Sequence, residues 1–276
     1  MSISLNYNSS SGFIKQSLSQ ATGEMSLHMK RLSSGMKINT SSDDAAGLGL
    51  SEKLQSQISA SDIAKTNTQT GVNLLQVADG DLAEIGSIMQ RMRDLSVQSA
   101  NGVYSASERT SLNAEFTTLR TEIDRVANSS SFSELNLLNT NGLNIVLQVG
   151  TNNSAQDKLT ITLDRATALD FAINASAIDT QGNAQTAMGA LDTAINTISS
   201  RRSTIGATVN RLASSMSRTD SRKENLSSAH SSIVDADIAT ESAGLSKSQI
   251  RQQASASLLQ QANSMSSVAL TLIKGY

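Results

Sequence analysis

No proline occurs anywhere in this chain of 276 residues. Proline interrupts an α-helix more strongly than any other residue, because it lacks a backbone donor and its ring clashes with the preceding turn. A chain without proline can therefore continue a helix over many turns. Apolar residues also recur at alternating steps of three and four in several segments, which is the spacing of a narrow coiled-coil-like seam.

Four such seams are visible before the last part of the chain. A single one would equally fit an ordinary amphipathic helix in a globular bundle. Four in one proline-free chain predict long helices that lie side by side. The seam residues are Ile14, Leu18, Ala21, Met25 and Leu32; Leu75, Ala78, Leu82, Ile85, Met89 and Met92; Leu112, Phe116, Leu119, Ile123 and Val126; and Leu191, Ile195, Ile198, Ile205, Val209, Leu212 and Met216.

Polar clusters mark the expected helix ends. The residues from Ser41 to Asp44 form an N-cap cluster, and a helix from there to about Ser99 would be roughly 85 Å long at 1.5 Å per residue. Ser105 and Glu108 have the spacing of a capping box, which predicts the start of the next helix. The segment from Ser231 to Asp237 is interpreted as a joint before a last helix.

The middle of the chain changes to a period of two. Alternate residues are apolar from Leu143 to Val149 and again from Leu159 to Leu163, with a polar turn between the two runs. This pattern predicts a β-hairpin with one buried face. A lone hairpin is marginal in water, so we expect its apolar face to pack on the long helices. The predicted fold class is mainly α, with long coiled-coil-like helices from both chain ends and a small β-hairpin region at about 140–165 between them.

Both ends of the chain are predicted to be amphipathic helices with little apolar surface of their own. Isolated helices of this kind are poorly ordered, because most helix stability comes from tertiary packing. We therefore expect their apolar positions to be buried against each other or against neighbouring copies. These positions are Ile14, Leu18, Met25 and Leu32 in the first helix and Ile250, Ala254, Leu258, Met265, Val268 and Leu272 in the last.

Composition argues against several functional classes. The chain has no cysteine, which excludes a disulfide framework, a thiolate zinc site and a cysteine nucleophile. Its two histidines, His28 and His230, are isolated, and no His-Glu-x-x-His, P-loop or dinucleotide-binding glycine motif is present. A net charge of −2 does not give the chain the positive electrostatic potential that attracts nucleic acid. No apolar run approaches the roughly 20 residues of a membrane-spanning helix, and no cleaved signal peptide is visible. We predict no catalysis, no cofactor, no metal site, no nucleic-acid partner and no membrane partner.

Several motifs, in the right order, closely resemble those of bacterial flagellins. Together they cover roughly residues 1–140 and 186–276, and their number makes the resemblance far more specific than any one motif. The matching stretches are Arg31 to Asn39 with Asp43 to Leu48, Gln90 to Asn101, Glu122 to Phe132 with Leu138 and Asn139, Ile233 to Glu241, and Gln249 to Met265.

The resemblance implies a structural subunit that polymerises into the hollow helical flagellar filament used for motility. Such subunits are exported unfolded through a type III channel and assembled at the filament tip, so the expected localisation is secreted and extracellular. Residues 1–42 and 233–276 would form an inner helical domain, and residues 43–232 a surrounding domain without the variable outer domains of larger flagellins. The implied partners are other copies of the chain, the flagellar cap, hook–filament junction proteins and an export chaperone bound to the C-terminal region. The alternatives are a hook–filament junction protein, which shares the helical ends, and an intracellular coiled-coil scaffold.

Two groups of surface residues follow from the same resemblance. Gln90, Arg91, Leu95 and Glu115 fall in stretches similar to those that the flagellin-sensing Toll-like receptor, a host innate immune receptor, reads on flagellins. The simpler interpretation is a solvated helix face with weak ion pairs. Some flagellins also carry O-linked glycans, and the hydroxyl residues around the hairpin are candidates, although polar solvent-facing positions are the simpler interpretation. These candidates are Thr151, Ser154, Thr160, Thr162 and Ser176.

Overall fold

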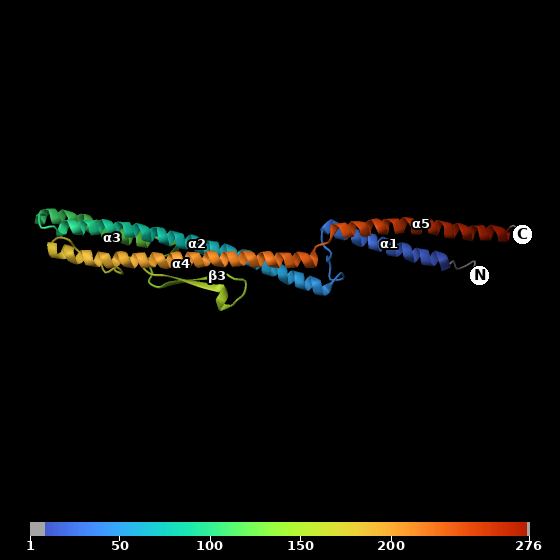
Figure 1. The fold of residues 1–276 in the computed structure, drawn as a ribbon, viewed down its shortest axis with the longest axis horizontal. Helices are drawn as coiled ribbons and strands as arrows, with labels where there is room; N and C mark the ends of the chain where they lie inside the picture. Colours follow the sequence, from blue (N-terminus) through green and yellow to red (C-terminus); the bar gives the residue numbers. More distant parts are fainter. Residues whose placement is uncertain (1–8, 275–276) are drawn as a thin grey trace. The chain divides into compact units, whose positions relative to one another are not determined.

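The computed structural model describes the backbone of residues 9–274 and the side chains of residues 9–265 (Figure 1). It divides into two compact units. Met1–Ser56 and Asn225–Tyr276 form the terminal unit, and Gln57–Glu224 forms the central unit. The helices are α1 (Ser9–Ser34), α2 (Ala45–Ala100), α3 (Ala106–Ser129), α4 (Gln181–Val234) and α5 (Ile238–Lys274). The strands are β1 (Ser131–Phe132), β2 (Leu135–Asn136), β3 (Leu143–Gln148) and β4 (Lys158–Leu163), and a short 3-10 turn, η1, covers Ala155–Asp157. The predicted mainly α fold is confirmed.

The core of the central unit is built from the predicted seams of α2, α3 and α4, which run alongside one another in Figure 1. All six seam residues of α2 are at most 1% exposed. Phe116 and Ile123 of α3 are fully buried, and so is Leu191 of α4. The few aromatic residues suit this arrangement, because thin helix-on-helix seams need no large rings.

Ion pairs fix the antiparallel register of α2 and α4 within the central unit. From one pair to the next, the residue number increases along α2 and decreases along α4, as an antiparallel arrangement requires. Each is exposed and contributes about 0–1 kcal/mol, so the pairs set the register more than the stability. They are Asp62–Lys223, Lys65–Asp220, Asp79–Arg202 and Arg93–Asp192.

The predicted hairpin is also present. β3 and β4 pair antiparallel, with Ile145 opposite Ile161 and Leu147 opposite Leu159. The alternate apolar residues of both strands pack against the helical core, whereas Val146 on the other face is 59% exposed. The hairpin approaches α2 closely at Gly71, where a Cβ atom would overlap the Leu147 side chain. Any larger residue at position 71 would require the Leu147 side chain to move.

Helix starts follow the predicted caps. The Ser105 hydroxyl accepts the Glu108 N–H, and the Glu108 carboxylate accepts the Ser105 N–H at 2.7 Å, which completes the capping box of α3. Asp44 Oδ1 accepts the Gly47 N–H at 2.9 Å at the start of α2. The predicted joint is the break between α4 and α5, where the Asp237 carboxylate accepts the Ala239 N–H at 2.9 Å.

One segment of the central unit was not anticipated. Between β4 and α4 the chain has no regular structure, yet Phe171, Ile173 and Ile178 are at most 5% exposed. Its backbone is held by side chains of α3, because Asp124 accepts the Ala168 N–H and Asn113 accepts the Ile178 N–H, each at 2.8 Å. The segment therefore forms part of the core although it is neither helix nor strand.

In the terminal unit, α1 and α5 lie side by side (Figure 1). The connections that precede α2 and follow α4 also pair with each other. Lys37 N–H donates to Val234 O at 2.7 Å, and Ala236 N–H donates to Gly35 O at 2.9 Å. Gly35 has a φ of 70°, a left-handed conformation that glycine adopts without a steric cost and that ends α1.

Candidate functional site

The α5 helix has two faces of different character. The face toward α1 carries the less exposed residues, which recur at steps of four and three: Glu241, Leu245, Ser248, Gln252, Ser255, Leu259 and Ala262. Most of these are polar or small. The predicted apolar residues Ile250, Ala254, Leu258 and Met265 lie on the opposite face and are exposed. The exposed fractions of Ile250, Leu258 and Met265 are 66%, 53% and 70%. We call these four residues the outer stripe. The side chains of Val268 and Leu272 lie outside the described residues.

The predicted positions of α1 lie on its inner face. Ile14, Leu18, Met25 and Leu32 are all half-buried, on the same side as the fully buried Ala21. These α1 residues therefore contribute to the pairing of α1 and α5, while the outer stripe of α5 does not.

The terminal unit buries little apolar surface by itself. Among the described side chains, its buried apolar residues are Ala21, Ile38 and Val234, and all the others belong to the central unit. Large apolar residues are instead exposed on both terminal helices, including Phe13 at 75% and Met29 at 49%. Exposed apolar surface of this extent marks an interaction surface.

A charged cluster fixes the register of α1 on α5. His28 Nδ1 lies 2.5 Å from Glu241 Oε2, and Arg31 Nη1 lies 3.2 Å from Glu241 Oε1. The hydrogen bond from His28, followed by that from Arg31, lowers the pKa of the Glu241 carboxyl below its ordinary value of 4.5, although burial opposes the shift. The His28 ring lies against Gly244, where a Cβ atom would come within 2.5 Å of Cε1. The histidine can occupy this position because residue 244 has no side chain.

The structure separates the candidate receptor-binding residues into two environments. Gln90, Arg91 and Glu115 are exposed, and Arg91 bridges to α3 with Nε and Nη2 at 3.0 and 2.7 Å from Glu115 Oε1. Leu95 is only 2% exposed and belongs to the helical core. Gln90, Arg91 and Glu115 can therefore contact a partner directly, whereas Leu95 supports the helix beneath them.

The candidate glycosylation residues also differ in accessibility. Thr160 and Thr162 are exposed on β4, and Thr162 Oγ1 donates to Asn144 Oδ1 at 2.7 Å. Ser154 is half-buried, and its hydroxyl donates to Asp157 Oδ2 at 2.9 Å. Ser176 is half-buried in the irregular segment, and Thr151 is half-buried with its hydroxyl oxygen inaccessible.

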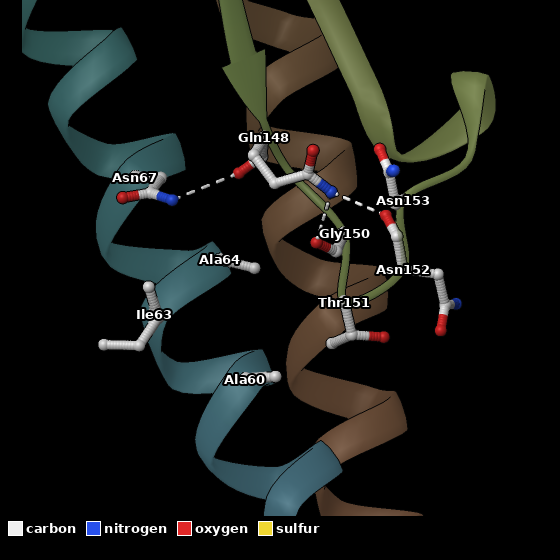
Figure 2. A pocket seen from close by; sticks show the side chains of 9 residues that line it. All are labelled: Ala60, Ile63, Ala64, Asn67, Gln148, Gly150, Thr151, Asn152 and Asn153. Carbon is white, nitrogen blue, oxygen red and sulfur yellow. Dashed lines mark hydrogen bonds between the residues drawn. The ribbon is translucent and has the colours of Figure 1, made fainter.

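A groove that sequence reasoning missed lies between α2 and the turn after β3 (Figure 2). Its volume is about 450 Å³, and Ala60, Ile63 and Ala64 of α2 form its apolar side. Gln148 holds the opposite side, because its Nε2 donates to Gly150 O at 2.9 Å and to Asn152 O at 2.7 Å. No periodic signal could have located the groove, because it depends on where the hairpin turn lies against α2.

The described residues contain no group of three or more His, Cys, Asp or Glu side chains that could hold a metal ion. Within the same part of the chain, every helix falls short of the length and hydrophobicity that a membrane-spanning segment requires.

Long paired helices with an exposed apolar stripe, and no cluster suited to holding a metal ion among the described side chains, are typical of a structural subunit. Comparison with known proteins identifies which one. Residues 5–142 match the bacterial flagellin N-terminal helical region, and residues 188–273 match the bacterial flagellin C-terminal helical region. A flagellin of Halalkalibacterium halodurans is 39% identical over 246 residues, which cover 89% of this chain and 90% of the relative. Flagellin FlaB1 of Treponema pallidum is 34% identical over 284 residues, which cover 98% and 99% of the two chains.

The chain belongs to the bacterial flagellin family. It is a structural subunit of the flagellar filament, an extracellular appendage, and it polymerises with other flagellin copies. A solved structure assigned to a flagellar hook-associated protein of Vibrio parahaemolyticus covers 70% of this chain and 100% of its own, with a TM-score of 0.59. Its sequence identity is 16%, which shows a shared fold alone. The hook-associated alternative therefore gains nothing beyond that fold.

Proposed function

We propose that the terminal helices of this flagellin become fully ordered only when copies assemble, and that the outer stripe of α5 is buried between subunits. The observation that carries this proposal is the exposure of Ile250, Leu258 and Met265 on a helix whose inner face is mostly polar. A helix pair that buries so little apolar surface gains most of its stability from further packing. Folding of the terminal unit is then coupled to polymerisation.

Electron microscopy of the purified chain after addition of filament seeds tests this mechanism. We expect long uniform tubes from the full chain. Deletion of residues 234–276 should abolish tube formation while circular dichroism still reports the central helices. Tubes assembled from the truncated chain would refute the coupling of folding to assembly.

Export and capping belong to the same proposal. A subunit secreted in unfolded form must keep its outer stripe covered until it reaches the filament tip. An export chaperone bound to the C-terminal region would cover Ile250, Leu258 and Met265, whose exposed apolar side chains favour aggregation. The cap and the hook–filament junction proteins would then meet the same terminal helices. We accordingly assign residues 1–42 and 233–276 to the inner domain of the filament and 43–232 to the surrounding domain.

We further propose that Gln90, Arg91 and Glu115 form the surface read by the flagellin-sensing Toll-like receptor, with Leu95 in a supporting position. We expect Arg91→Ala to weaken receptor activation by the monomer and to slow filament growth, because it removes an exposed charge and its bridge to Glu115. Its effect on the unfolding free energy should stay below about 1 kcal/mol, since the pair is exposed. A reporter-cell assay with the monomer measures receptor activation. Activation by Arg91→Ala at the wild-type level would contradict the proposed receptor surface.

Among the candidate glycosylation residues, Thr160 and Thr162 are the proposed acceptors, because they are exposed on the hairpin. The hydroxyls of Thr151 and Ser154 are buried or engaged in the turn. Peptide mass spectrometry of filaments should find any glycan on β4, and a glycan confined to Thr151 or Ser154 would contradict this order of accessibility.

The cluster around Glu241 predicts a specific dependence on pH. Its carboxyl has a lowered pKa in the folded chain, so its stabilising effect is present above about pH 4.5 and is lost as the pH falls through the lowered value. Glu241→Gln mimics the protonated carboxyl at every pH. We expect this variant to destabilise filaments by about 1–2 kcal/mol per subunit near pH 7 and to match the wild type at low pH.

The midpoint of denaturant-induced filament dissociation, followed by light scattering at several pH values, measures this difference. Glu24→Gln is the matched control, because Glu24 pairs with Arg251 across the same two helices but is about half exposed. A deficit of Glu241→Gln that persists unchanged in acid would contradict the assigned ion pair.

A further inference from the structure

We propose that the central unit binds a small inorganic oxyanion, of the sulfate or phosphate class, in a cavity between the hairpin turn and α4. The cavity has a volume of about 180 Å³ and is lined by the turn that follows β3 and by the α4 residues Ser215, Arg218, Thr219 and Arg222. This proposal goes beyond filament assembly and does not depend on it. Every lining residue belongs to the central unit.

The two arginines supply the charge that selects an anion. Arg218 and Arg222 are four residues apart on α4, so they lie on the same helix face. Among the described residues neither guanidinium has a carboxylate within 4.0 Å, whereas Arg202 and Lys223 of the same helix pair with Asp79 and Asp62. Arg218 donates only a long hydrogen bond of 3.4 Å, to the Ser215 hydroxyl. Both side chains are exposed, so their mutual repulsion is weak, and a shared oxyanion would replace it with a charge-assisted hydrogen bond to each guanidinium.

The opposite wall of the cavity carries an unsatisfied hydroxyl. Thr151 Oγ1 is buried and has no hydrogen-bond partner in the described chain. Thr151 lies between the groove of Figure 2 and this cavity, and in that view its hydroxyl is turned away from Ala60 of α2. A buried hydroxyl without a partner is destabilising, so such groups normally meet a ligand or water. Its oxygen has no accessible surface in this position, so an anion in the cavity would accept from it only after the Thr151 side chain turns toward the arginines.

The acidic group in the lining does not neutralise the arginines. Asp157 Oδ2 accepts hydrogen bonds from the Asn152 N–H at 3.1 Å and from the Ser154 hydroxyl at 2.9 Å. This carboxylate therefore stabilises the turn. Two guanidinium groups against one carboxylate leave the lining with a net positive charge, and the hydroxyl of Thr219 provides a further donor.

Isothermal titration calorimetry of the full chain with sodium sulfate tests the site, with sodium chloride at equal ionic strength as the reference. Light scattering recorded on the same samples ensures that the chain stays unassembled. We expect saturable binding of one sulfate per chain. Arg222→Gln and Arg218→Gln should each weaken that binding at least about tenfold, because each removes a charged donor to the anion.

Two further variants make the test specific. Arg211→Gln removes an exposed guanidinium of the same helix outside the cavity lining, so it should leave sulfate affinity within about twofold of the wild type. Thr151→Val removes the unsatisfied hydroxyl at nearly constant shape. It should raise the thermal unfolding midpoint without sulfate, because it removes a buried hydroxyl that has no partner. Absence of saturable binding, or equal losses in Arg211→Gln and Arg222→Gln, would overturn the proposal.

Discussion

Replacing Ile250 and Leu258 together by glutamate should abolish filament formation and leave the unassembled chain folded. Both side chains are more than half exposed on the outer stripe of α5, so the change removes little packing within one copy. In a filament these positions would be buried between subunits, where each unpaired carboxylate costs several kcal/mol. Electron microscopy and sedimentation measure assembly, and circular dichroism of the monomer checks its helix content.

The matched control places the same charges elsewhere on α5. Gln249→Glu with Gln260→Glu adds two carboxylates at exposed positions that lie about 80–100° around the helix from Ile250 and about 160–180° from Leu258. This variant should assemble much more readily. Normal filaments from the Ile250/Leu258 variant, or an equal loss in the control, would show that the outer stripe is not an intersubunit surface.

The second large effect concerns Leu95, which belongs to the proposed receptor surface and yet is buried. We expect Leu95→Ala to lower the unfolding free energy of the central unit by about 2–5 kcal/mol, because it opens a cavity in the core beside Met92 and the other α2 seam residues. Denaturant unfolding followed by circular dichroism measures this change. Any loss of receptor activation by this variant would then arise from a distorted surface around Arg91.

Val97→Ala is the control for this prediction. Val97 lies two residues further along α2 and is 46% exposed, so its truncation should change the unfolding free energy by no more than about 0.5 kcal/mol. Equal stability of Leu95→Ala and Val97→Ala would contradict the buried position of Leu95.

The sequence predicts the central unit well, because the helices and the hairpin there are marked by regularly spaced apolar residues. The α2 seam from Leu75 to Met92 is buried as its spacing requires, and the hairpin follows the change of period from 3.5 to 2. The capping box at Ser105 and Glu108 depends only on local chemistry, so it is also predictable.

Prediction is weaker where packing uses polar or small residues. The inner face of α5 includes Glu241, Ser248 and Ser255, which carry no hydrophobic signal, so apolar spacing located the opposite face of the helix. The irregular segment before α4 is held by hydrogen bonds to Asp124 and Asn113, which lie more than 40 residues earlier in the chain. Such contacts depend on the tertiary arrangement and leave no local pattern.

The pairing of α1 with α5 also determines when the terminal unit of each copy can fold. His28 meets Glu241 across 213 positions of sequence, and Glu24 meets Arg251 across 227. Contacts between residues so far apart in sequence form only once the whole intervening chain is present, because its two ends must first come together. A copy cut short before Glu241 would lack both contacts, so its α1 helix would have neither partner within its own chain.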